Sequence, residues 1–186
     1  MGFLSEYKRP PGAYAFHTTS CENVEPILES GVVRQDSDSP GNKDINAVLS
    51  EQGFTDPFPF DRSDVIYCHV DATYVEDTQK SLQEHGFNSD EVVIVVSVGA
   101  IDAPMYLADM SLVSDLIDYR HAGSGVMMHA DTPEEAVQLY KESIVRVEGP
   151  DDIRADPSPE RNHTELIIEG DIPPTAIADI RSAASE

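Results

Sequence analysis

The chain has 186 residues, which is enough for one core, and we predict a single domain over residues 1–186. It carries 35 Asp and Glu against 12 Lys and Arg, a formal net charge of −23. No basic stripe of the kind that strong electrostatic nucleic-acid binding requires is visible, so a nucleic-acid partner would have to be held by shape and stacking. No apolar run reaches the roughly 18 residues of a membrane helix.

The acidic residues are spread through amphipathic patterns and are not collected in one tail. In dilute buffer their repulsion opposes the compact state, whereas in molar salt the Debye length falls to roughly 3 Å. The charge therefore predicts the acidic protein of a halophile. Cys21 and Cys68 form no C-x-x-C pair, and the N-terminus lacks a secretory signal, so we expect a reducing cytoplasm.

The first half of the chain predicts three strands, each followed by a helix. Val24, Ile27 and Leu28 share one helical face, and Pro26 fits only a first turn. In chain order we predict a strand at 14–17, a helix capped by Asn23 and ended by Gly31, a strand starting at Val32, a short helix after Asn42, a rigid loop at 54–60, a strand at 65–70, and a helix from its cap Asp71 to Gly86.

The second half continues with a segment at 91–98 that is nearly all Val and Ile, typical of a strand buried on both faces. A helix follows near 111–119. Thr132, Pro133 and Glu135 form a capping box that starts a helix ending near Ser143. We predict strands at 144–147 and 163–169, separated by a loop, and a tail at 171–180. Strands and helices do not alternate regularly, so the predicted class is α+β: a mixed, mostly antiparallel sheet with helices packed on it.

Standard catalytic and metal motifs are not found in the sequence. The six histidines form no H-E-x-x-H motif. Cys68 and His69 are neighbours on a predicted strand, so their side chains point to opposite faces and cannot share one ion. We therefore expect no metal.

Three segments stand out together: 16–19 with the helix at 23–32, the strand at 65–74, and the strand at 164–174. Their order resembles the ADP-ribosyltransferase superfamily of the His-Tyr-Glu type, in which a histidine strand precedes a helix and a late strand begins with Glu. The resemblance implies an ADP-ribosyltransferase-like fold and NAD as substrate. The stretch Ile172-Pro173-Pro174 is most similar to the nucleic-acid-modifying toxin branch.

The resemblance also implies residue roles. His17 would hold the NAD ribose, and Tyr67 would stack on nicotinamide, with Tyr74 as a second candidate. Glu165 would bind a ribose hydroxyl and stabilise the oxocarbenium-like transition state. The implied cofactor contacts also include Thr18 and arginines for the diphosphate: Arg9, Arg34 and Arg62.

Two departures from the family pattern matter. Thr18 replaces the usual glycine. His163, two residues before Glu165, replaces the carboxylate of the arginine-modifying branch. The resemblance implies transfer to a macromolecular acceptor of unknown identity, as in a toxin or defence effector.

A second hypothesis is a catalytically inactive binding or structural module, for example viral, on the same fold. On this hypothesis His17 is a structural histidine at a strand end. Tyr67 is a half-buried core residue, and Glu165 points outward at a strand edge. The enzyme hypothesis predicts that these three side chains line one cleft. Placement of Glu165 on the face opposite His17 would mean that the family site is not formed, and would decide for the binding module.

Overall fold

The protein is built on one antiparallel sheet. The computed structural model describes residues 2–33, 47, 58–62, 64–85, 90–122, 127–155 and 163–182. The strands are β1 (Tyr14–Ser20), β2 (Val65–His69), β3 (Glu91–Ser97), β4 (Met105–Asp109), β5 (Val145–Val147), β6 (Thr164–Glu169) and β7 (Ile177–Arg181). Their order is β5-β4-β6-β2-β1-β3-β7, and every ladder between them is antiparallel. The predicted α+β class is therefore confirmed.

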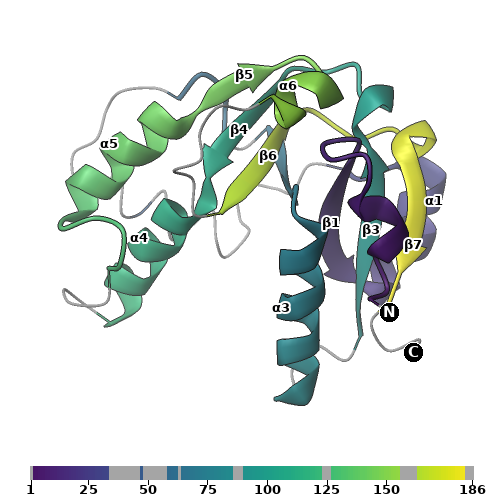
Figure 1. The fold of residues 1–186 in the computed structure, drawn as a ribbon, viewed down its shortest axis with the longest axis horizontal. Helices are drawn as coiled ribbons and strands as arrows, with labels where there is room; N and C mark the ends of the chain where they lie inside the picture. Colours follow the sequence, from purple (N-terminus) through teal and green to yellow (C-terminus); the bar gives the residue numbers. More distant parts are fainter. Residues whose placement is uncertain are drawn as a thin grey trace.

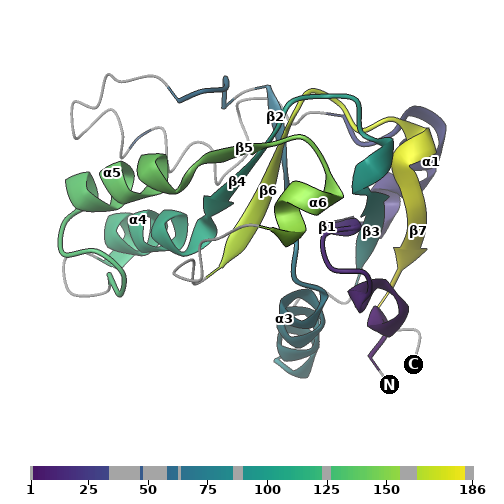
Figure 2. The ribbon, with the colours of Figure 1, turned by 45° about the horizontal axis from the view of Figure 1, so that its top comes forward.

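Helices cover both faces of the sheet. They are α1 (Val24–Ser30), α3 (Ala72–Glu84), α4 (Met110–Ala122), α5 (Pro133–Ser143) and α6 (Pro150–Arg154), with single 3₁₀ turns at Ser5–Lys8, Cys21–Asn23, Val98–Ala100 and Pro174–Ala176. Figures 1 and 2 show α4 and α5 side by side over the β4–β6 half and α3 apart from them. We name the two faces after adjacent residues of β6, the Glu165 face and the Leu166 face.

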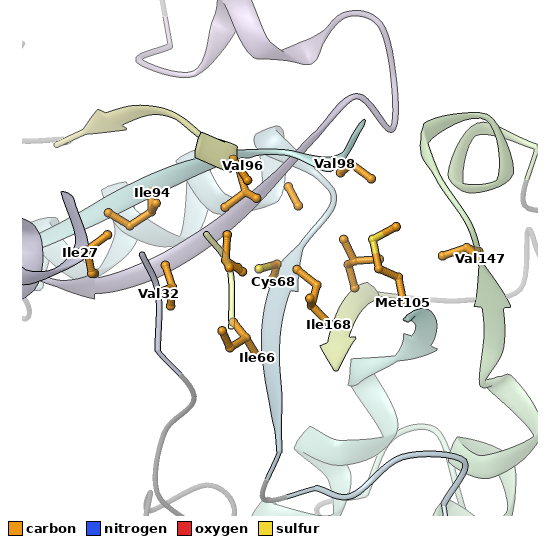
Figure 3. Close-up of a cluster of buried hydrophobic side chains, with 14 of the residues drawn as sticks. Ile27, Val32, Ile66, Cys68, Ile94, Val96, Val98, Met105, Val147 and Ile168 are labelled. Carbon is orange, nitrogen blue, oxygen red and sulfur yellow. The ribbon is translucent and has the colours of Figure 1, made fainter. Parts of the chain in front are cut away.

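The largest core cluster lies on the Leu166 face (Figure 3). There the strands pack against Ile27 of α1, and burying each such side chain contributes about 1.5–3 kcal/mol. The Glu165 face instead carries two separate clusters. One joins Phe16 to α3 through Val75, and the other joins Ala108 to Tyr140 of α5.

Few backbone pairs join the two halves of the sheet, β5-β4-β6-β2 and β1-β3-β7. Strand β1 pairs with β3 along seven residues but with β2 at one position, Phe16 opposite His69. His69 in turn lies opposite Glu165, and Glu165 lies opposite Ala108. Glu165 and His69 therefore lie side by side on the sheet between the α3 cluster and the α4–α5 cluster.

The predicted helix ends are confirmed where a local contact defines them. Asp71 Oδ1 accepts hydrogen bonds from the amides of Thr73 at 2.7 Å and Tyr74 at 3.3 Å. Thr132 Oγ1 accepts from the Glu135 amide at 3.2 Å. Gly31 ends α1 with φ of 84°, and a Cβ there would lie 2.0 Å from the Ile172 carbonyl oxygen, so only glycine fits.

Several predicted elements differ from the structure. Strand β1 continues three residues past the predicted 14–17, to Ser20, because these residues pair with β3. Leu28 is 56% exposed and not part of the core face. Val32 forms one bridge, with Ile172, and no strand. The sequence reading missed β4, β7 and α6. The predicted helix after Asn42 and most of the 54–60 loop lie outside the described residues.

Candidate active site

Glu165, the second residue of β6, is a buried carboxylate with 4% of its surface exposed. The Tyr140 hydroxyl of α5 donates to its Oε1 at 2.9 Å. Burial raises the pKa of Glu165 to about 7, although the Tyr140 hydrogen bond and the Arg62 charge both favour ionisation. A carboxyl group with this pKa exchanges its proton near neutral pH, a property typical of catalytic carboxylates.

Tyr67 lies beside Glu165 on the same face, because it pairs with Ile167, two residues further along β6. The guanidinium carbon of Arg62 lies 5.7 Å from the Tyr67 ring centroid, a cation–π distance. Burial raises the pKa of the Tyr67 hydroxyl to about 12. That hydroxyl is buried and has no hydrogen-bond partner among the described residues. A buried, unpartnered donor is costly to the fold, so it is a candidate ligand contact.

His17 does not share the Glu165 face. It alternates along β1 with Phe16, which lies opposite His69 and therefore on the Glu165 face. The His17 ring reaches β2, where Nδ1 lies 3.0 Å from the Tyr67 carbonyl oxygen. Burial lowers the pKa of His17. The structure thus brings Tyr67 and Glu165 together and ties His17 to the backbone of Tyr67.

The other predicted cofactor contacts are scattered. Thr18 is half-buried on the Glu165 face of β1, and Tyr74 is 38% exposed in the first turn of α3. Among the arginines proposed for the diphosphate, Arg62 is buried at the site, and Arg9 is exposed before β1. Arg34 lies outside the described residues.

Three further residues at the site were missed from sequence. The sequence pattern places Tyr140 in a helix but does not indicate its contact with Glu165, because that contact depends on how α5 packs. His69 and His163 both lie two residues from a predicted site residue on the same strand segment, so strand alternation places them on the Glu165 face. That alternation was the available indication for them.

A pocket of about 260 Å³ lies at the turn between β2 and α3. Its walls do not include Glu165, Tyr67 or His17; they are formed by Tyr7, Lys8, Pro11, Gly12, Tyr14, Val70, Asp71, Ala72 and Thr73. In the part of the chain that the structure describes, no three His, Cys, Asp or Glu residues gather as a metal site would require. No helix there is both long and apolar enough to cross a membrane.

Comparison with known proteins adds two similar structures. No family model and no curated protein matches the chain. The chain is similar to two solved structures of DarT from Thermus sp. 2.9, one in complex with carba-NAD+ and one with NAD+. Each is 13% identical and covers 92% of this chain and 82% of the DarT chain, with TM-scores of 0.46 and 0.43.

Proposed function

We propose that the protein is an enzyme that transfers ADP-ribose from NAD to a macromolecular acceptor. The observation that carries the proposal is the buried carboxylate of Glu165, which accepts a hydrogen bond from Tyr140 and lies beside Tyr67 and Arg62. Breaking the nicotinamide–ribose bond creates positive charge at the ribose, and a carboxylate fixed next to that carbon stabilises it. The Tyr67 ring offers an aromatic face to the cationic nicotinamide.

Arg62 is the described arginine best placed for the diphosphate. Its guanidinium lies 5.4 Å from the Phe58 ring centroid and 5.7 Å from that of Tyr67, so aromatic rings hold it in place. A guanidinium is a strong donor to phosphate oxygens. In this proposal the nicotinamide end of NAD lies at Tyr67, with the reacting ribose beside Glu165.

A second candidate function is a binding module without chemistry. The placement of His17 on the face opposite Glu165 favours it, because the three predicted catalytic residues then do not line one surface. In this case the Tyr140–Glu165 hydrogen bond is a structural contact of a buried pair. The two candidates differ in whether the folded protein binds and cleaves NAD.

Calorimetric titration with NAD in molar KCl separates the two candidates. For the enzyme we expect saturable binding, followed by slow release of nicotinamide detected by chromatography. Circular dichroism in the same buffer must first show a folded chain, since an unfolded sample would mimic an inactive one. A folded protein that neither binds NAD nor releases nicotinamide contradicts the enzyme and leaves the binding module.

Replacement of Tyr67 with phenylalanine tests the unpartnered hydroxyl. We expect the unfolding free energy to stay constant or rise by about 1 kcal/mol, because the substitution removes a buried polar group. NAD binding should weaken about tenfold, since the hydroxyl would find its partner in the ligand. Urea unfolding and calorimetry measure the two effects.

The matched control is Tyr106→Phe on the next strand but one. The Tyr106 hydroxyl already donates to Glu169 at 3.4 Å, so its loss should leave NAD binding unchanged. A Tyr67→Phe variant that is less stable than wild type and binds NAD equally well would assign the hydroxyl to the fold.

A further inference from the structure

Two histidines form a contact pair on the Glu165 face. His69 Nδ1 and His163 Nε2 lie 3.2 Å apart, so one ring donates a hydrogen bond to the other. His69 belongs to β2, and His163 immediately precedes β6. The Tyr74 ring packs against both histidines and meets the His163 ring edge to face.

The pair lies directly beside Glu165. His69 is the cross-strand partner of Glu165, and His163 is two residues before it on the same face, a spacing of about 7 Å along a strand. A nucleophile that attacks a ribose held at Glu165 would therefore approach close to an imidazole.

The two rings differ in how readily they take a proton. Burial, together with the charges of the neighbouring His163 and His17, lowers the pKa of His69 to about 4. Burial also lowers the pKa of His163, but the charges of Asp109 on β4 and Asp71 before α3 oppose this. The charges of the two aspartates therefore favour His163 over His69 as the ring that takes a proton.

The hydrogen bond between the rings is compatible with this assignment. In a protonated His163 both ring nitrogens are donors, so Nε2 must donate and His69 Nδ1 must accept. A neutral His69 has that lone pair available. Before protonation, the same arrangement leaves His163 Nδ1 as the free acceptor of the pair.

Resting on the proposed function, we propose that His163 is the general base that takes the proton from the acceptor, with His69 as its positioning residue. The acceptor is then one with a neutral hydroxyl or N–H group, or water. Its oxygen or nitrogen forms a bond to the ribose carbon while the bond to nicotinamide breaks. The electron pair of that bond goes to the nicotinamide nitrogen and neutralises the ring. The acceptor proton goes to His163 Nδ1.

Chemical rescue tests this assignment with water as the acceptor. His163→Ala should lower the rate of NAD hydrolysis in molar KCl by about 10²–10⁴-fold at unchanged KM. Added imidazole should restore the rate at least about tenfold, and the rescue should follow the neutral form of imidazole. Glu165→Gln should not be rescued, and His85→Ala, which removes an exposed histidine at the end of α3, should behave like wild type. A His163→Ala variant with wild-type activity, or one that imidazole does not rescue, overturns the proposal.

His69 and the pair itself are tested separately. His69→Asn keeps an acceptor for His163 Nε2 and should retain most of the activity. His69→Leu removes that acceptor and should lose the activity without a change in KM. Nitrogen-15 NMR of the free protein should show His163 protonating before His69, a result that does not depend on turnover. If wild type neither binds nor cleaves NAD, the proposed function fails even when this order is seen. If wild type is active and His69 protonates first, only the assignment of the base fails.

Discussion

Glu165→Gln is expected to remove NAD turnover and, at the same time, to stabilise the fold above neutral pH. In the proposed reaction the carboxylate would act on charge that develops as the glycosidic bond breaks, so we expect a loss of about 10²–10³-fold in kcat. NAD binding should change little. Glutamine is nearly isosteric, and its carbonyl oxygen can still accept the Tyr140 hydrogen bond.

The stability effect follows from the pKa of Glu165, which burial raises from 4.5 to about 7. Between these pH values the folded protein keeps a proton that the unfolded chain has lost. Wild-type stability therefore falls as the pH rises through this range and stays at its lower value above pH 7, a loss of up to about 3 kcal/mol. The Glu165→Gln variant lacks this loss, so the difference between its unfolding free energy and that of wild type should grow from pH 4.5 to 7.

Thermal or urea unfolding of both proteins across this pH range measures the effect. The difference between them cancels the titration of the histidines. Glu169→Gln is the matched control, because Glu169 lies on the same strand and face but is only half-buried. The Glu169→Gln variant should keep wild-type NAD turnover. A Glu165→Gln variant that still cleaves NAD, or that is less stable than wild type above pH 7, contradicts the role of Glu165.

The largest physical effect is expected from salt. With a net charge of −23, the chain should lose circular dichroism on dialysis to low salt and regain it in molar KCl. The Debye length falls from about 30 Å at 0.01 M to about 3 Å at 1 M salt, which removes most repulsion between exposed charges. Unfolding midpoints measured against KCl concentration test this. A thermal midpoint that is equal in low and molar salt would end the halophile hypothesis.

Helix α1 offers a local control for the salt prediction. Glu25 and Glu29 are exposed, four residues apart, and repel each other on one helical face. The double amide variant, Glu25→Gln with Glu29→Gln, should fold at a lower KCl concentration than wild type. The double aspartate variant keeps both charges and should not. Equal salt midpoints for all three would assign the salt effect to something other than charge repulsion.

The sequence alone determined those features whose cause is local. Asp71 and Thr132 start helices because their side chains meet amides two or three residues away, and Gly31 ends one because its backbone takes a positive φ. The valine run of β3 is buried as predicted, since such a run can lie only inside a sheet. Tyr67 and Glu165 could be proposed as candidate site residues because the segments around them resemble those of a known family, and their catalytic roles stay predictions.

Tertiary structure decided what depends on register and on helix packing. Strand β4 was missed because its five residues are all buried by pairing with β5 and β6, and its short sequence shows no alternation. The face of His17 follows from one ladder pair, Phe16 with His69, and a shift of one residue would have reversed it. The His69–His163 contact and the Tyr140 hydrogen bond join residues far apart in the chain, so no local pattern could specify them.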